Sequence, residues 1–229
     1  MKPHLHFIVG PTTTGKTNRS IELAEKTGGP VIVLDRIQCF PDLAVGSGRP
    51  SAAELRATSR IYITNRNVTD GELSAAEANA LLHEHLARLS PNAPLLILEG
   101  GSISLLRTMA ADPPWRAHNQ TWERLRLPST DGHLAKAESR VLEMLMPSEG
   151  TRSMMDEIAS LWPDVRSHAV LRGIIGYRTA IAYAERCGIP ITELPRLPQN
   201  RLEYLAKEIA SEYLVYARQQ EHELPERFS

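Results

Sequence analysis

Short apolar runs recur through the first half of the chain. The strongest runs occupy 5–9, 31–34 and 95–98. Runs of this length, bounded by turn residues or charged residues, are typical of buried strands. Weaker patterns at 61–64 and 122–127 mark two further strand candidates. We therefore expect the first three runs to form the centre of a sheet.

Amphipathic segments lie between these runs. Residues 16–27 repeat apolar side chains at helical spacing and stop at a pair of glycines. A shorter helix is expected after the loop at 41–51. Residues 74–89 have the clearest helical pattern, because Ser74 and Glu77 have the spacing of a reciprocal capping box. Apolar side chains share one face of this helix: Ala78, Leu81, Leu82, Leu86 and Leu89.

The alternation of strands and helices predicts an α/β fold, in which helices cover both faces of a parallel sheet. In such sheets, ligands bind at the carboxyl ends of the strands. Three polar clusters of this sequence, 10–17, Asp35 and 99–102, directly follow predicted strands. The sequence therefore predicts a ligand site at that edge of the sheet.

Helical patterns dominate the second half of the chain. They cover 132–146, 153–162, 169–187 and 200–221. Prolines punctuate the connection between the last two segments. We interpret 1–229 as one domain, with an α/β core at 1–130 and a mainly helical closing portion at 131–229.

The overall charge limits the class of partner. The chain has 26 basic and 27 acidic residues, whereas a protein that grips many phosphates of a polynucleotide usually has a basic excess. We therefore expect small-molecule substrates and no nucleic-acid partner.

Other whole-chain features indicate where the protein works. No apolar stretch approaches the roughly 20 residues needed to cross a bilayer, so no membrane anchor is expected. The first residues lead directly into a strand-like run, without the apolar segment of a secretory signal. Cys39 and Cys187 are far apart in the sequence, which favours a fold without disulfides in a reducing compartment. The expected location is the cytoplasm, and the sequence leaves open whether the protein is a monomer or a dimer.

One segment matches a phosphate-binding motif at every position. Residues 10–17 are Gly-Pro-Thr-Thr-Thr-Gly-Lys-Thr and fit the P-loop pattern G-x-x-x-x-G-K-[ST] between a predicted strand and a predicted helix. The glycines let the loop curl until its backbone N–H groups converge on an anion, and the helix N-terminus adds a positive dipole. Lys16 supplies a mobile charge, and the Thr17 hydroxyl suits a Mg²⁺ ligand. The motif predicts a bound diphosphate or triphosphate, held by Gly10, Thr13, Thr14, Gly15, Lys16 and Thr17.

Two carboxylates follow predicted strands beside this loop. Asp35 can accept a hydrogen bond from an attacking N–H or O–H group and take up the proton as a bond forms. The same side chain can instead cap the next helical turn. Position alone leaves both interpretations open. Glu99 ends the third strand, where an acidic residue can contact a magnesium ion through water.

Several sequence blocks at the predicted site have a family likeness. Besides the P-loop, they are Leu-Asp-Arg-Ile-Gln at 34–38, Gly-Ser-Gly-Arg-Pro at 46–50 and Leu-Glu-Gly-Gly-Ser-Ile-Ser-Leu-Leu at 98–106. Together they resemble the bacterial adenylate isopentenyltransferases, the cytokinin synthases of plant-associated bacteria. The likeness continues through 176–178 and 212–214 and covers nearly the whole chain. P-loops occur in many families, whereas the blocks at 34–38 and 98–106 are more specific.

The resemblance implies a P-loop fold that transfers a dimethylallyl group from its diphosphate to the 6-amino group of AMP, with Mg²⁺ as cofactor. It implies that Asp35 is the general base, with Thr12 nearby and Lys16 assisting the chemistry. Arg140 and Tyr213 would join the P-loop in holding the donor diphosphate. The acceptor nucleotide would contact Asp35, Arg36, Ser47, Arg49, Gly101 and Ser102.

Two positions differ from some members of that family. Those members have Asp and His where this chain has Ile175 and Tyr216, at positions that face the prenyl tail. Less polar side chains leave a donor hydroxyl unpaired, which is unfavourable beside apolar groups. The resemblance therefore implies a prenyl pocket that prefers an unhydroxylated donor. The apolar stripe of 200–221 is expected to close over this pocket and exclude water.

Two other enzyme classes share parts of the pattern. A tRNA prenyltransferase has the same loop and carboxylate, but this chain shows no evident insertion for gripping RNA and no basic excess. A small-molecule P-loop kinase needs an arginine-bearing lid, and the chain has arginines but no recognisable lid motif. A nucleotide-binding switch without catalysis has no need of the carboxylate at position 35. Prenyl transfer to adenylate is therefore the expected activity.

Overall fold

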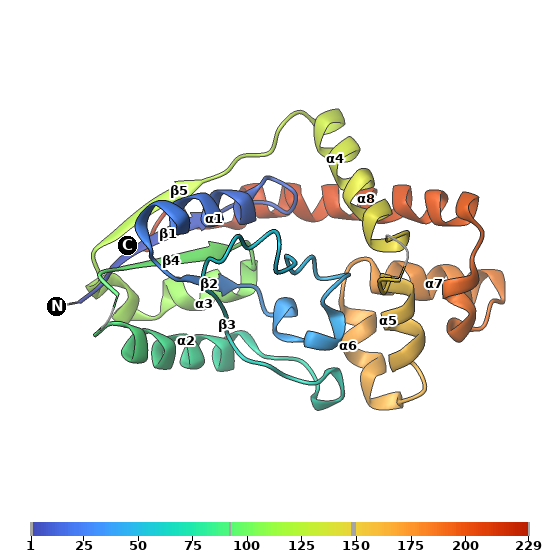
Figure 1. Cartoon of the computed structure of the whole chain (residues 1–229), viewed down its shortest axis with the longest axis horizontal. Helices are drawn as coiled ribbons and strands as arrows, with labels where there is room; N and C mark the ends of the chain where they lie inside the picture. The colour runs from blue at the N-terminus through green and yellow to red at the C-terminus, as the bar shows by residue number, and fades with distance from the viewer. Residues whose placement is uncertain (1, 92, 148–149, 229) are drawn as a thin grey trace.

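The computed structural model describes residues 2–91, 93–147 and 150–228. At its centre lies a five-stranded sheet of order β3-β2-β4-β1-β5, in which all neighbouring strands are parallel (Figure 1). The strands are β1 (His4–Val9), β2 (Val31–Leu34), β3 (Arg60–Tyr62), β4 (Leu95–Gly100) and β5 (Gln120–Arg124). The expected parallel α/β sheet is confirmed.

Helices cover both faces of the sheet, because successive side chains of a strand point to opposite faces and both sets are apolar here. Helix α1 (Lys16–Thr27) packs on one face. Helices α2 (Ala75–Leu89) and α3 (Ile103–Ala111) cover the other. The first face buries a small cluster: Ile8, Ala24, Val31 and Ile97. The second buries a larger one that includes Leu5, Phe7, Leu34, Leu82, Leu98 and Leu106.

The second half of the chain is mainly helical. Its helices are α4 (Thr130–Leu145), α5 (Met154–Leu161), α6 (His168–Gly173), α7 (Tyr177–Cys187) and α8 (Gln199–Glu223). They bury a further apolar cluster, which also includes Phe40 and Leu43 from the first half. That 1–229 forms one domain stays a prediction. Within the described residues, no helix combines the length and apolar character that crossing a membrane requires.

Helix α8 connects the helical portion to the sheet. It packs along α4 and runs back toward the strands (Figure 1). Beyond its end, Phe228 meets the rings of Phe7 and Trp122 edge-on, and Leu224 joins the same cluster. This helix therefore passes directly over the carboxyl ends of the strands, where the site was expected.

The segment 169–187 is two helices, so the expectation of one continuous helix was wrong. Helix α6 ends at Gly173, Ile174 is extended, and α7 begins after Gly176. The φ of Gly176 is 89°, a value that glycine adopts without the steric cost other residues incur. The break brings Ile175 to the wall of the central cavity.

Two local expectations also need correction. The shorter helix expected after 41–51 is a series of turns, in which Arg56 and Ala57 have positive φ. At the start of α2, Ser74 accepts a hydrogen bond from the Glu77 N–H as expected. The Glu77 carboxylate, however, pairs with an arginine, Arg66, so the capping box is one-sided.

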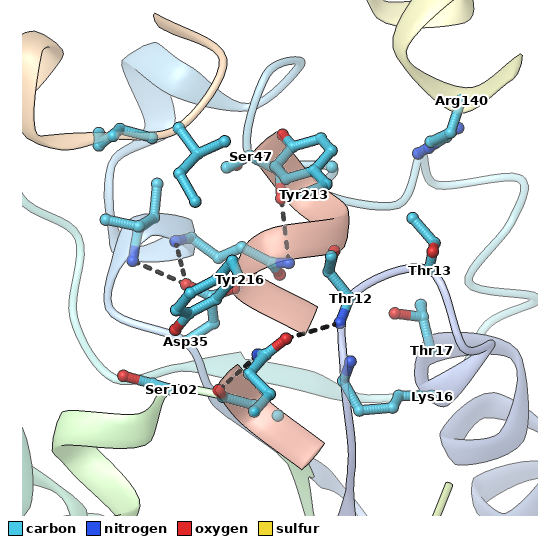
Figure 2. Close-up of a pocket in the computed structure, with 18 of the residues that line it drawn as sticks. Thr12, Thr13, Lys16, Thr17, Asp35, Ser47, Ser102, Arg140, Tyr213 and Tyr216 are labelled. Carbon is cyan, nitrogen blue, oxygen red and sulfur yellow. Dashed lines mark hydrogen bonds between the residues drawn. The ribbon is translucent and has the colours of Figure 1, made fainter. Parts of the chain in front are cut away.

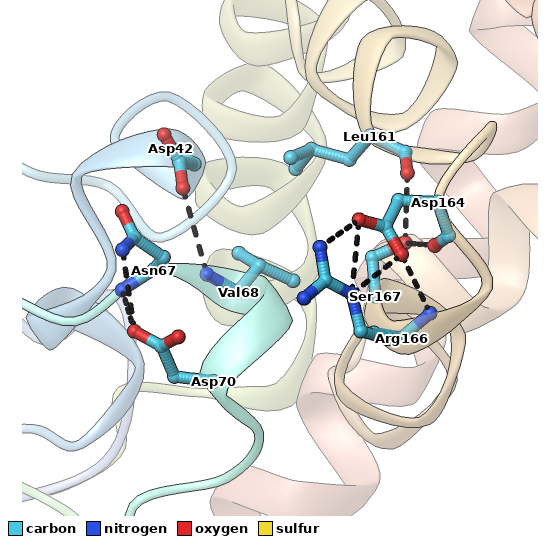
Figure 3. A network of polar contacts seen from close by, with 8 residues as sticks. All are labelled: Asp42, Asn67, Val68, Asp70, Leu161, Asp164, Arg166 and Ser167. Atoms are coloured by element: carbon cyan, nitrogen blue, oxygen red, sulfur yellow. Dashed lines mark hydrogen bonds and ion pairs between the residues drawn. The ribbon is translucent and has the colours of Figure 1, made fainter.

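Two sets of polar contacts, one in the first half of the chain and one in the helical portion, lie beside each other (Figure 3). Two short 3₁₀ helices, η3 (Val68–Asp70) and η5 (Val165–Ser167), contact each other there. Asp42 accepts a hydrogen bond from the N–H at the start of η3. Asp164 caps η5 and pairs with Arg166. The polar contacts within each set fix η3 and η5, and these two short helices pack against each other.

Candidate active site

A large cavity lies at the carboxyl ends of β1, β2 and β4, under helix α8. Its volume is about 810 Å³. Lys16, Thr17, Thr13 and Arg140 lie on one side, and Asp35, Ser102 and Tyr216 lie on the other (Figure 2). Cavities of this size can enclose a whole small-molecule ligand. One end of the cavity thus has the P-loop residues that suit a phosphate, and the other end has the Asp35 carboxylate.

The P-loop after β1 has the conformation that its glycines require. A side chain at Gly10 would place its Cβ 2.5 Å from the Leu125 carbonyl oxygen, so only glycine fits. Gly15 has a φ of 92° and caps the start of α1. Thr13 also has a positive φ, of 62°, although it is not a glycine. A strained non-glycine residue of this kind persists where surrounding contacts fix it, often at a ligand site.

Lys16 lies inside the loop rather than in solvent. Its Nζ donates a hydrogen bond to the Pro11 carbonyl oxygen at 2.6 Å, an acceptor that it shares with the Thr14 hydroxyl. Burial lowers the pKa of Lys16, while the nearby carboxylates of Glu99 and Asp35 oppose that shift. Burial therefore disfavours the charged amine, and an anionic ligand beside it would favour the charged form.

Asp35 caps the turn after β2 and also lines the cavity, while its role as general base stays a prediction. Its Oδ1 accepts hydrogen bonds from the N–H groups of Ile37 at 2.8 Å and Gln38 at 3.3 Å, so it caps the turn after β2. Its side chain also lines the cavity, and no described residue donates a hydrogen bond to Oδ2. Burial raises the pKa of Asp35, although the two backbone N–H groups oppose that shift. One oxygen thus fixes the orientation and the other is available to a ligand.

Glu99 forms a buried ion pair with Arg60 of β3. The Arg60 Nη2 and the Glu99 Oε2 are 2.7 Å apart, and the two side chains are 2% and 5% exposed. The Nε and Nη1 of Arg60 have no hydrogen-bond partner among the described residues. A pair this buried is stable only while both members are present. The predicted water-mediated contact of Glu99 with magnesium stays a prediction.

Most of the predicted site residues come together in this cavity. Those that line it are Thr12, Thr13, Gly15, Lys16, Thr17, Asp35, Arg36, Ser47, Glu99, Gly101, Ser102, Arg140, Ile175, Tyr213 and Tyr216. Gly10 and Thr14 lie in the loop behind the lining and shape it. Arg49 is not brought to the cavity. Its guanidinium bonds to the Gln38 carbonyl oxygen and lies 4.0 Å from the centre of the Tyr62 ring.

Gln220 of α8 is a site residue that sequence reasoning missed. Its Oε1 accepts a hydrogen bond from the Thr12 N–H at 3.0 Å, and its Nε2 donates to the Gly101 carbonyl oxygen at 2.7 Å. The side chain is 3% exposed. It therefore ties the P-loop, the end of β4 and the last helix together. No local pattern distinguishes it from other polar residues of that helix.

Replacing Gln220 with methionine should lower the free energy of unfolding by about 1–3 kcal/mol, because two buried backbone groups lose their partner. Chemical denaturation measures this loss. The matched control is Gln219→Met on the same helix, since Gln219 is exposed and bonds only to Glu223 among the described residues. Equal losses in the two variants would contradict the bridging role.

His133 of α4 is a second missed residue. Its side chain is fully buried, and its Nδ1 lies 3.1 Å from the Thr13 hydroxyl. Burial lowers the pKa of His133, which favours the neutral ring. The contact supports the strained conformation of Thr13. It also fixes the helix that carries Arg140 two turns later, which explains how Arg140 comes to line the cavity.

Two tyrosines of α8 form the roof of the cavity. Burial raises the pKa of Tyr213 to about 12, so its hydroxyl stays protonated and can donate a hydrogen bond to an anion. Burial also raises the pKa of Tyr216. Ile175 faces the same space from the break before α7. This part of the cavity is less polar than the P-loop side.

A parallel sheet with a P-loop after its first strand, and a carboxylate after its second, defines a P-loop enzyme whose site has room for two substrates. The isopentenyl transferase family model matches residues 3–228, so the chain belongs to that family. The family resemblance of the sequence blocks is confirmed.

Two similar relatives share one name. The adenylate dimethylallyltransferase of Allorhizobium ampelinum is 46% identical over 222 residues, which cover 96% of this chain and 93% of that protein. The protein of the same name from Ralstonia nicotianae is 45% identical over 225 residues, with 97% and 94% covered. These lengths show that the similarity extends over nearly the whole of each protein.

Solved structures confirm the fold. The tRNA isopentenylpyrophosphate transferase of Bacillus halodurans superposes with a TM-score of 0.73 at 18% identity, covering 96% of this chain and 86% of that one. The corresponding enzyme of Staphylococcus epidermidis gives 0.69 at 17% identity, covering 96% and 89%. At such low identity the likeness shows a shared fold alone.

Proposed function

We propose that this chain transfers a dimethylallyl group from dimethylallyl diphosphate to the exocyclic 6-amino group of AMP and releases diphosphate, the first step of cytokinin biosynthesis. The observation that carries the proposal is that Asp35 lies in the same cavity as the P-loop. A P-loop alone serves many reactions, whereas a carboxylate facing it supplies a base for an amine acceptor. The name shared by the relatives supports the choice of adenylate.

At the donor end, residues of this chain offset the negative charge that grows on the departing diphosphate. The free N–H groups at the start of α1 suit an anion. Lys16 and Arg140 add positive charge, and Tyr213 can donate its hydroxyl hydrogen to a phosphate oxygen. Each such preorganised contact commonly lowers a barrier by about 3 kcal/mol.

At the acceptor end, Asp35 takes up the proton that the reaction releases. The bond between the allylic carbon and the diphosphate oxygen breaks, and a bond from that carbon to the adenine nitrogen forms. One N–H proton of the amine passes to Asp35, so charge and atoms balance. The raised pKa of Asp35 makes its ionised form a stronger acceptor for that proton.

The residues at the start of α1 fit a magnesium ion that is held largely by the substrate phosphates. Mg²⁺ usually keeps several waters and takes only one or two protein ligands. Thr17 lines the cavity there, and its hydroxyl is the ligand that we propose. Glu99 is tied to Arg60, so for it we propose at most a contact through water. When bound, the ion would neutralise part of the diphosphate charge.

The direct test is mass spectrometry of AMP incubated with the protein, dimethylallyl diphosphate and Mg²⁺. We expect AMP that carries one added five-carbon prenyl unit. A parallel reaction offers an adenine-rich anticodon stem-loop in place of AMP. Prenylation of the RNA without prenylation of AMP would overturn the proposal in favour of a tRNA enzyme.

The donor should be preferred without a hydroxyl group. Ile175 lines the cavity with an apolar side chain and offers no hydrogen bond to a donor hydroxyl. An unpaired hydroxyl beside apolar groups costs about 1–3 kcal/mol, so kcat/KM should be about tenfold or more lower for the hydroxylated donor. Competition between the two donors measures the ratio. Ile175→Asp should bring the ratio of the two kcat/KM values closer to one. Equal use of both donors by the unaltered chain would contradict the predicted preference for the unhydroxylated donor.

A further inference from the structure

The loop after β2 is anchored from behind by a buried carboxylate of the helical portion. Glu157 of α5 accepts hydrogen bonds from the N–H groups of Val45 at 2.8 Å and Gly46 at 3.0 Å. The Tyr177 hydroxyl donates to the same carboxylate at 2.5 Å. Three donors from two separate parts of the chain thus converge on one side chain.

This carboxylate lies inside the protein. Glu157 is 2% exposed and Tyr177 is fully buried. Burial raises the pKa of Glu157, and its three neutral donors oppose that shift. A buried carboxylate is costly unless its hydrogen bonds are satisfied, whereas an apolar side chain would fill the same space at no such cost. We therefore expect Glu157 to orient the loop and Tyr177 through its directed hydrogen bonds, and not to serve mainly as a packing residue.

Gly46 fits this arrangement and leaves no room for a larger residue. A Cβ at this position would lie 2.2 Å from the Tyr177 hydroxyl oxygen. Because that oxygen belongs to a fully buried ring, it cannot move aside easily. The contacts among Gly46, Tyr177 and Glu157 therefore restrict the position of each of the three residues.

The anchored loop forms one wall of the cavity. Ser47 and Gly48 follow Gly46 directly and line the cavity. The Ser47 carbonyl oxygen accepts a hydrogen bond from Gln38 Nε2 at 3.2 Å, and Gln38 lies three residues after Asp35. The anchor thus reaches the wall nearest the base, on the side away from the P-loop (Figure 2).

We propose that Glu157 and Tyr177 are positioning residues for the acceptor: they hold the Ser47–Gly48 segment where it contacts the adenine nucleotide. The inference rests on the proposed function, because it takes adenylate as the acceptor. Neither residue lines the cavity, so both act through the loop. Disturbing them should weaken the acceptor's contacts and leave the P-loop unchanged.

The mild test is Tyr177→Phe, which removes one hydroxyl and keeps the buried ring. We expect the KM for adenylate to rise about fivefold to tenfold, the usual effect of one lost buried hydrogen bond, with the KM for dimethylallyl diphosphate within about twofold. The matched control is Tyr183→Phe on the same helix. Among the described residues its buried hydroxyl has no hydrogen-bond partner, so neither KM should change.

A second variant tests the carboxylate itself. Glu157→Gln keeps one acceptor oxygen and places an N–H₂ group against the remaining donors, so the KM for adenylate should rise further. In the double variant with Tyr177→Phe the two effects should be less than multiplicative, because both act on one network.

Two failures can be told apart. An unaltered chain that does not prenylate adenylate overturns the proposed function, and this inference with it. An active chain in which Tyr177→Phe raises both KM values equally, or changes neither, overturns the inference alone.

Discussion

Asparagine at position 35 should lower kcat by about a hundredfold to ten-thousandfold, the range typical of losing a general base. Asp35→Asn keeps an oxygen that can accept hydrogen bonds from the Ile37 and Gln38 N–H groups, so the turn after β2 should remain. The amide cannot take up the proton of the adenine amine. Steady-state kinetics with both substrates measure the effect, and the KM for the allylic donor should stay within about twofold.

The matched control for this variant is Asp42→Asn. Asp42 also accepts a backbone hydrogen bond, from Val68, but it does not line the cavity. Its turnover should be nearly normal. Unaltered turnover in Asp35→Asn would show that another group takes the proton.

Lys16→Ala should reduce kcat/KM for dimethylallyl diphosphate by about a hundredfold to a thousandfold and should lower kcat as well. Lys16 is buried inside the P-loop, where a bound diphosphate would favour its charged form and where that charge would stabilise the departing diphosphate. Varying the donor concentration at saturating adenylate measures both parameters. The KM for adenylate should change much less.

Lys26→Ala is the control, because Lys26 is exposed in the last turn of the same helix, α1. It should behave like the unaltered chain. Normal donor kinetics in Lys16→Ala would contradict the role of the P-loop in holding the diphosphate.

Local signals predicted the central elements well. The strand at 31–34 and the helix at 16–27 have the expected bounds, because an apolar run and a glycine stop are decided by neighbouring residues. The prediction of one continuous helix at 169–187 was wrong, because the local spacing of apolar residues does not reveal the break. Its apolar spacing continues through Gly176, and only the backbone angles show that the chain leaves the helix there.

The residues of the site also fall into two groups: those that local motifs predicted and those that only the folded structure reveals. The P-loop and Asp35 could be predicted because each motif follows its own strand and the topology brings the strand ends together. Gln220 and His133 reach the P-loop from more than a hundred residues away, so no sequence window contains both partners. Arg49, in contrast, was predicted to belong to the site but does not line the cavity. It lies two residues from Ser47, yet it turns away from the cavity to bond the Gln38 carbonyl oxygen.

The central claim is that the P-loop here holds a departing diphosphate, so that carbon rather than phosphorus is transferred. Dimethylallyl diphosphate with a heavy-oxygen label in the bridge between carbon and phosphorus tests it directly. After reaction with AMP, mass spectrometry should find the label in free diphosphate, in an amount equal to that of prenylated AMP. Label retained on the five-carbon fragment, together with a phosphorylated nucleotide, would mean that a phosphorus–oxygen bond had broken and would contradict the account.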